Sequence, residues 1–340
     1  MNWLSVFFLW LSLAPLSLSA FPFLYVAQND GSSSIFNIAV PSAPSYQSSA
    51  SNLQAFAMTL SCCNRCIYGP TSNEGLLYLW DFTNPNQPVF VQNAPGNSLP
   101  WGALVPIDNP NFWVPGGGVN IFSVYPMFDP ANPGGPVAPL QSIDFFAMYP
   151  DMPFLYTLQN NALVTYNVAD PANPILESSI PITSSHLILH PTGSNLYVVD
   201  SANLQLAVFD LSSPTSPTLL STNLSIGANP QMAVIEPSGN YLYVANQGDN
   251  SLSIFNIQTP SAPLAEPTFT SPNLSQPSSL ICSPDGSSLY VGNQGASSIS
   301  VLNIQVQAAP VWIQDLSVSQ VPSFMTINTP YPYPFARVRG

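Results

Sequence analysis

Few side chains in this sequence have the chemistry to move a proton or hold a metal ion. His186 and His190 are the only two histidines among 340 residues. If both lie on one strand, their spacing of four places them on the same face but roughly 13 Å apart. That separation favours structural roles over a shared metal or an acid/base pair. His190 is kept as a weak catalytic candidate, at the expected end of a strand beside a turn.

Glu236 and Asp144 are the other two weak catalytic candidates. Both fall in segments expected to form strands around the centre of the fold, and a carboxylate there can act as a general acid or base. Neither belongs to a recognised catalytic motif. The sequence has no Gly-x-Ser-x-Gly elbow and no evident set of Ser, His and Asp. We therefore expect no cofactor and no metal, and we leave the catalytic residues open.

Four cysteines are present, at positions 62, 63, 66 and 282. The cluster Cys62, Cys63 and Cys66 lacks the nearby histidine or fourth thiol that would complete a zinc site. A local disulfide, Cys62 to Cys66 or Cys63 to Cys66, is favoured instead, because it would pin a hairpin turn that lacks the usual proline and glycine.

The charge of the chain excludes several classes of partner. Lysine is absent, and three arginines stand against sixteen acids, which leaves a net charge of −13. Nucleic acids and anionic lipid surfaces bind clustered Lys and Arg, so neither is expected as a partner. The charge is better explained as keeping the surface soluble.

The N-terminus has the layout of a secretory signal peptide. An apolar stretch at 4–18 is followed by the small residues Ser19 and Ala20 before Phe21, and it is too short for a membrane span. We expect residues 1–20 to be removed and residues 21–340 to form one domain that is secreted, periplasmic or at the cell surface. No membrane span is expected after cleavage, and the protein is expected to be a monomer.

A turn marked by proline, which we call the corner, recurs along the sequence. Its spacing indicates the fold that positions the candidate residues. The corner ends at seven prolines spaced 41 to 47 residues apart: Pro44, Pro88, Pro133, Pro174, Pro217, Pro263 and Pro310. A period of roughly 40 to 50 residues with strand-like units is typical of a β-propeller. The sequence therefore predicts an all-β, seven-bladed propeller.

Alignment on the corners predicts four antiparallel strands in each blade. The second strand is centred on an aromatic residue, and the third ends just before the corner, in patterns of alternating apolar and polar residues. The weaker fourth strand follows the corner, where proline suits an outer edge. The expected boundaries are 54–98, 99–141, 142–183, 184–228, 229–276 and 277–320 for blades two to seven.

The first blade lacks a first strand of its own, because Phe21 leads almost directly into Leu24-Tyr25-Val26. Residues 321–329 match the pattern of a first strand instead. We therefore expect blade one to consist of 21–53 plus 321–329, so that the C-terminal strand closes the ring.

Two stretches resemble known propeller repeats. Leu242-Tyr243-Val244-Ala245-Asn246 resembles the YVTN type, and the segment 168–174 (VADPANP) resembles the LVIVD type of prokaryotic surface proteins. The resemblance covers 21–329 and extends to the seven-bladed lactonase-like superfamily, which implies lactone hydrolysis as a possible activity. None of that group's catalytic residues maps onto a matching motif here.

Without a recognised catalytic set, the expected function is a non-enzymatic scaffold. Its rim loops or central mouth would bind a protein or a glycan. The alternative is a lactonase-like hydrolase or lyase with its site at the mouth of the central channel.

Overall fold

The computed structural model describes residues 22–50, 145–148, 153–170, 173–184 and 186–328. Between residues 59 and 138 it adds the backbone of strands β4 to β10. The secondary structure of this part of the chain is entirely β, and it contains no helix that would be long and apolar enough to cross a membrane.

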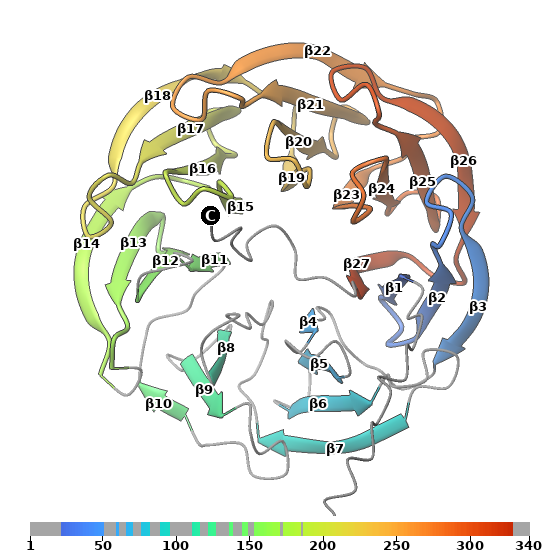
Figure 1. The fold of residues 1–340 in the computed structure, drawn as a ribbon, viewed down its shortest axis with the longest axis horizontal. Helices are drawn as coiled ribbons and strands as arrows, with labels where there is room; N and C mark the ends of the chain where they lie inside the picture. The colour runs from blue at the N-terminus through green and yellow to red at the C-terminus, as the bar shows by residue number, and fades with distance from the viewer. Residues whose placement is uncertain are drawn as a thin grey trace, which may run out of the picture.

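Seven antiparallel sheets surround a common centre, one for each predicted repeat (Figure 1). The protein is a seven-bladed β-propeller, which confirms the fold class expected from the spacing of the corners. Six sheets have four strands. The sheet of blade three has three described strands, and the segment expected to supply its first strand lies outside the described residues.

The strands of blades four to seven run in chain order from the centre to the rim. Blade four contains β11 (Phe145–Met148), β12 (Phe154–Gln159), β13 (Ala162–Asn167) and β14 (Ile175–Pro181). Blade five contains β15 (His186–Leu189), β16 (Asn195–Asp200), β17 (Gln205–Asp210) and β18 (Thr218–Ser225). Blade six contains β19 (Pro230–Ile235), β20 (Tyr241–Asn246), β21 (Ser251–Asn256) and β22 (Leu264–Thr270). Blade seven contains β23 (Pro277–Cys282), β24 (Ser288–Asn293), β25 (Ser298–Asn303) and β26 (Val311–Ser317).

Blades two and three occupy the remaining sector of the ring. Blade two contains β4 (Thr59–Leu60), β5 (Cys66–Pro70), β6 (Leu76–Asp81) and β7 (Val89–Pro95). Blade three contains β8 (Asn111–Pro115), β9 (Phe122–Pro126) and β10 (Pro136–Ala138).

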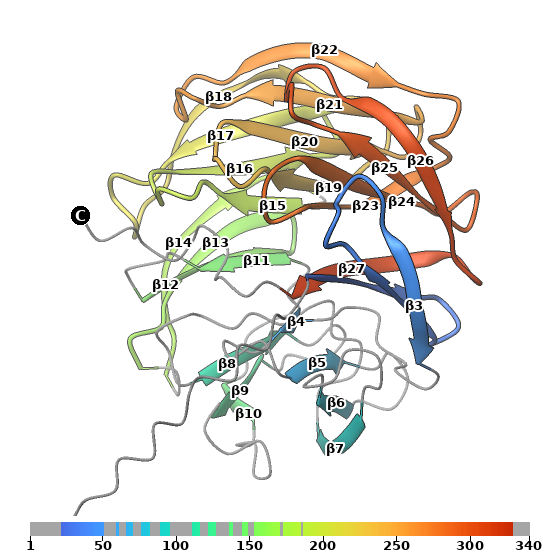
Figure 2. The same ribbon diagram turned by 45° about the vertical axis from the view of Figure 1, so that its right-hand side comes forward.

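Blade one combines the two ends of the described chain, as expected. Its strands are, from the centre outwards, β27 (Pro322–Asn328), β1 (Phe23–Gln28), β2 (Ser33–Asn37) and β3 (Ser45–Ala50). The C-terminal strand β27 lies beside β1 in both ribbon views (Figures 1 and 2), and Leu24 pairs with Ile327 in its register. The predicted closure of the ring is confirmed.

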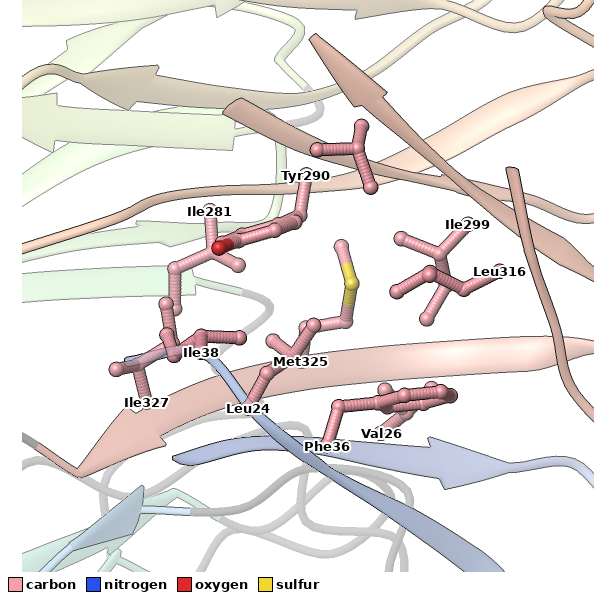
Figure 3. Close-up of a cluster of buried hydrophobic side chains, with 11 residues drawn as sticks. Leu24, Val26, Phe36, Ile38, Ile281, Tyr290, Ile299, Leu316, Met325 and Ile327 are labelled. Atoms are coloured by element: carbon pink, nitrogen blue, oxygen red, sulfur yellow. The ribbon is translucent and has the colours of Figure 1, made fainter. Parts of the chain in front are cut away.

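Apolar side chains fill the interface where the ring closes (Figure 3). Met325 and Ile327 of β27 pack with side chains of blade one and of blade seven, among them Leu24, Phe36 and Ile299. Alternate residues of an inner strand face opposite neighbours, so one strand can contribute to two such interfaces. In β23, Ile281 packs toward blade one, whereas Cys282 packs toward blade six.

The repeated aromatic residue and the repeated corner are joined by one kind of hydrogen bond. Each donor is the phenol of a central tyrosine, and each acceptor is the carbonyl at the start of the next blade's corner. The pairs are Tyr156 to Pro214, Tyr197 to Pro260, Tyr243 to Gln307 and Tyr290 to Pro41, at 2.9 to 3.0 Å. Burial raises the pKa of Tyr197, Tyr243 and Tyr290, so these phenols stay protonated as donors.

Candidate active site

The carboxylate of Glu236 lies in the turn that follows β19, and only 1% of the residue is exposed. Its Oε2 accepts a hydrogen bond from the Ser238 amide at 2.7 Å, and its Oε1 accepts one from the Asn240 amide at 2.8 Å. The Ser238 hydroxyl and the Tyr241 amide also donate to Oε1. Four donors from one turn hold this carboxylate, so the geometry accounts for Glu236 as the acceptor that shapes the turn.

His190 connects the corresponding turn of blade five to blade six. Its Nε2 lies 3.1 Å from the Gly239 carbonyl oxygen, and its Nδ1 lies 3.2 Å from the Thr192 amide nitrogen. A carbonyl can only accept, and an amide N–H can only donate, so the proton is on Nε2 and Nδ1 is the acceptor. Burial lowers the pKa of His190, which favours this neutral form. The side chain is a neutral link between two blades.

In blade seven, the turn after the innermost strand also contains an acid, but this acid is two residues beyond the position that Glu236 occupies in blade six. Ser283 occupies the slot of Glu236 and His190, and its hydroxyl donates to Asp285 at 2.6 Å. Partial burial would raise the pKa of Asp285, but hydrogen bonds from Ser283 and Ser287 outweigh it and lower that pKa. Three blades thus supply the acceptor of one turn with three different side chains, which explains why acids and histidine appear near one another in the repeat.

The remaining sequence candidates lie outside the described residues. These are Asp144, just before β11, and Cys62 and Cys63 of the expected disulfide; Cys66 begins β5, where the structure describes only the backbone. The expected disulfide and the role of Asp144 therefore stay predictions.

His186 lies on an innermost strand of the ring. It begins β15, and it is the only His, Asp or Glu among the described side chains of the innermost strands β11, β15, β19, β23 and β27. Its ring meets the Phe145 ring edge to face, with centroids 5.0 Å apart. It also hydrogen-bonds the backbone of Ala233 in β19. One imidazole thus contacts the inner strands of blades four and six from its place in blade five.

The electrostatics of His186 keep it neutral. Burial lowers the pKa of this histidine to about 4, although the bond to Ala233 opposes the shift. Its Nδ1 is buried and has no hydrogen-bond partner among the residues that the structure describes. The bond to Ala233 is therefore assigned to Nε2, and Nδ1 retains an unused lone pair that can accept a proton.

Half-buried apolar side chains lie on the innermost strands of blades four, five, six and one. Phe145, Ile188, Met232, Val234 and Phe324 are each half-buried. An innermost strand is covered by neighbouring blades on both faces, so this partial exposure is toward the centre of the ring or the strand ends. We call these five residues, with His186, the inner wall. Within this set, His186 is the one side chain that can act as a base.

The sequence alone predicts a structural role for His186, because its spacing from His190 excludes a shared site. The structure separates the two, because His190 is engaged at both nitrogens in a turn, whereas His186 begins an innermost strand. The alignment of the repeats contains the information that separates the two histidines. It already placed His190 at a strand end and His186 four residues earlier, within the strand.

Part of the chain matches the sequence model of a known family. Residues 154–272, about a third of the chain, match the sequence model of the family described as lactonase, 7-bladed β-propeller. No curated protein matches the chain.

Several solved structures share the fold over nearly the whole chain. The periplasmic gluconolactonase of Pseudomonas aeruginosa is 17% identical, with a TM-score of 0.74 over 91% of this chain and 99% of that one. A Bacteroides uniformis protein assigned as a 6-phosphogluconolactonase is 15% identical, with a TM-score of 0.75 over 90% and 98%. A protein of unknown function from Desulfotomaculum acetoxidans is 12% identical, with a TM-score of 0.77 over 91% and 99%. At these identities the likeness establishes the fold alone.

The expected non-enzymatic scaffold is wrong. The family match and the lactonase-like neighbours favour the alternative, a lactonase-like hydrolase. The repeat motifs encode strands, tyrosines and corners, which carry no information about activity, so the lack of a catalytic motif does not show the lack of a site. The protein has the fold of the lactonase-like seven-bladed propellers, and its fourth to sixth blades carry the sequence match to that family.

Proposed function

We propose that the protein is a lactone hydrolase. Water adds to the ring carbonyl of a lactone, the bond between the carbonyl carbon and the ring oxygen breaks, and the open-chain hydroxy acid is released. The observation that carries this proposal is the family match over residues 154–272. The matched segment includes β15 and β19, and therefore His186 and the backbone of Ala233 that it bonds.

His186 supplies the proton transfer in this proposal. Nδ1 is buried in the structure, so in this proposal the groups that cover it move aside when the lactone binds. Nδ1 then takes a proton from the attacking water, and the same proton passes to the ring oxygen as that oxygen leaves as an alcohol. A pKa of about 4 makes the imidazole a weak base that is ready, unprotonated, over the whole neutral range. The bond to Ala233 fixes the tautomer that presents Nδ1.

The test is a spectrophotometric assay of the purified protein against a panel of γ- and δ-lactones, with the uncatalysed rate subtracted. We expect turnover that falls by a factor of about 100 or more in His186→Gln. Glu236→Gln and Asp144→Asn are assayed in parallel, and circular dichroism verifies that each variant is folded. Absence of turnover across the panel contradicts the hydrolase proposal. Full activity in folded His186→Gln contradicts the assignment of the base.

A location outside the cytoplasm is part of the proposal. The apolar stretch before Phe21 supports it, as does the likeness to a periplasmic gluconolactonase. N-terminal sequencing of protein from the native host is expected to begin at or next to Phe21. A mature chain that retains Met1 contradicts the signal peptide.

A further inference from the structure

We propose that Phe145 of blade four is a positioning residue for His186 of blade five: its ring fixes the plane of the imidazole and keeps water from it. The catalytic consequence of this inference rests on the proposed hydrolase function. The effect of Phe145 on the imidazole does not, and it is tested separately below.

Phe145 and His186 occupy equivalent positions in neighbouring blades. In each innermost strand with described side chains, one residue pairs with the residue that stands two beyond the central tyrosine of the next strand. These residues are Phe145, His186, Met232, Ser279 and Phe324, which pair with Leu158, Val199, Ala245, Gly292 and Ala27. We call the five residues of the innermost strands the inner layer. His186 is its one member that can act as a base.

Contacts of the inner layer run from one blade to the next. His186 hydrogen-bonds the backbone of Ala233, which follows Met232 in β19. The Met232 sulfur accepts a hydrogen bond of 3.4 Å from the Leu280 amide of blade seven. Phe145 has no polar atom to offer, and its ring meets the imidazole of blade five instead, with centroids 5.0 Å apart and planes at 75°. The imidazole is therefore held by blade six at Nε2 and by blade four through its ring.

The hydrogen bond to Ala233 does not by itself set the direction of Nδ1. Rotation about the bond between Cβ and Cγ of a histidine is broad and roughly twofold. Nε2 lies close to the axis of that rotation, so the ring can turn while the bond at Nε2 persists. An edge-to-face contact with a second ring does restrict the plane. The Phe145 ring thus keeps Nδ1 in one direction when the groups that cover it move aside.

Phe145 also contributes to the burial that keeps His186 neutral. Desolvation is the main cause that lowers the pKa of His186 to about 4. A phenyl ring against the imidazole occupies space that water would otherwise fill. Removal of that ring should therefore raise the pKa.

Charged neighbours do not account for this low pKa. Strands β11, β12 and β19, which pack against β15, contain no Asp, Glu, Lys or Arg. Strand β16 contributes Asp200, whose carboxylate accepts hydrogen bonds from the backbone and side-chain amides of Asn203 at 3.0 and 2.8 Å. The tyrosines of β12 and β16, Tyr156 and Tyr197, donate to the corners at the rim. Within the described part of the chain, neutrality of the imidazole thus depends on apolar contacts.

The test is an NMR titration of protein that carries isotope-labelled histidine. The chain has two histidines, and the signal that is missing in His186→Gln identifies His186. We expect Phe145→Leu to raise the pKa of His186 from about 4 to about 5 or higher, because water reaches the imidazole, and to leave the pKa of His190 unchanged. An unchanged pKa of His186 in folded Phe145→Leu overturns the proposal.

Two further variants separate this contact from a general loosening of β11. Phe146 is the next residue of the strand and is also half-buried, but it packs with the cluster that contains Leu155 and Val164, whereas Phe145 packs with the cluster of Leu187. Phe146→Leu is therefore the matched control, and we expect the pKa of His186 to stay low. Phe145→Tyr retains the ring and should also keep it low. An equal rise in Phe146→Leu overturns the specific role of Phe145.

The kinetic consequence is a change in kcat and not in KM. At pH 7 we expect kcat on a lactone that the protein hydrolyses to fall about tenfold in Phe145→Leu, with KM changed less than about twofold. The acid limb of the pH profile of kcat should move to higher pH with the pKa of His186, because the base must be unprotonated. Phe145→Tyr should retain kcat. Full kcat and an unshifted profile in Phe145→Leu contradict the positioning role.

The outcomes distinguish this inference from the proposed function. A raised pKa of His186 in Phe145→Leu alone, without turnover of any lactone by the wild-type protein, supports the effect of Phe145 on the imidazole and contradicts the hydrolase. Turnover by the wild-type protein with an unchanged pKa of His186 in Phe145→Leu supports the hydrolase and overturns the role of Phe145.

Discussion

The phenolic O–H of Tyr290 donates a hydrogen bond of 2.9 Å to the carbonyl of Pro41, 249 residues away in sequence. Tyr290 lies in the last blade, and Pro41 begins the corner of the first. The bond therefore ties the two ends of the ring at the rim side of the closing interface, while β27 ties them at the centre.

Tyr290→Phe removes this bond and leaves the ring of the side chain in place. We expect the free energy of unfolding to fall by about 1–2 kcal/mol, because the Pro41 carbonyl loses its partner in a part-buried site. Urea denaturation measures the change. Tyr46→Phe is the control, since Tyr46 is exposed and its hydroxyl makes no hydrogen bond with the described part of the chain. Equal stability of Tyr290→Phe and wild type contradicts the prediction.

Deletion of 321–340 removes β27 and with it the innermost strand of blade one. We expect a large fall in the midpoint of thermal unfolding, because Met325 and Ile327 leave the core and β1 becomes an exposed edge. A shorter deletion of 329–340 leaves β27 intact and serves as the control. Differential scanning calorimetry compares the two, and an unchanged midpoint in the longer deletion rules out closure as a source of stability.

Stability is expected to fall between pH 6.5 and pH 4 because of His186. Burial lowers the pKa of this residue from 6.5 to about 4 in the folded protein, so the unfolded chain binds more protons across this window. The contribution reaches about 3 kcal/mol at the acid end. Urea midpoints at pH 7 and pH 4.5 measure it.

His186→Gln supplies the comparison for that pH dependence. The variant should lose less stability than wild type between pH 7 and pH 4.5, because it has one group fewer that protonates on unfolding. His190, whose pKa burial also lowers, keeps part of the dependence in both proteins. Parallel curves for the two proteins would show that His186 is not held neutral.

Glu236→Gln is expected to destabilise the fold by about 1–3 kcal/mol and to leave kcat unchanged. The buried carboxylate accepts four hydrogen bonds, and an amide would turn its NH2 group toward some of those donors. Thermal unfolding and the lactone assay measure the two effects. Normal stability with lost activity would return Glu236 to the catalytic candidates.

The scaffold was largely predictable, because it repeats. Seven corners fixed the number of blades, and the absence of a first strand before Leu24 identified residues 321–329 as the closing strand. The tyrosine and the corner were each visible, but the bond between Tyr290 and Pro41 was not. It joins different repeats, and an alignment of repeats compares only equivalent positions.

The candidate site was less predictable, because its parts meet only in three dimensions. His186 contacts Phe145 and the backbone of Ala233, which belong to three consecutive blades. Glu236 is a catalytic candidate by sequence because it is an acid near the centre of the ring. In the structure, backbone amides of its own turn donate hydrogen bonds to its carboxylate.

The four described bonds between tyrosine and corner point the same way around the ring, from each of blades four to seven to its successor. A copied unit therefore carries one donor for the unit after it and one acceptor for the unit before it. Insertion of such a unit by gene duplication would leave no partner unmatched at either seam. The individual unit does not encode how many blades the ring contains, and a propeller of this kind can grow by whole repeats until its two ends meet.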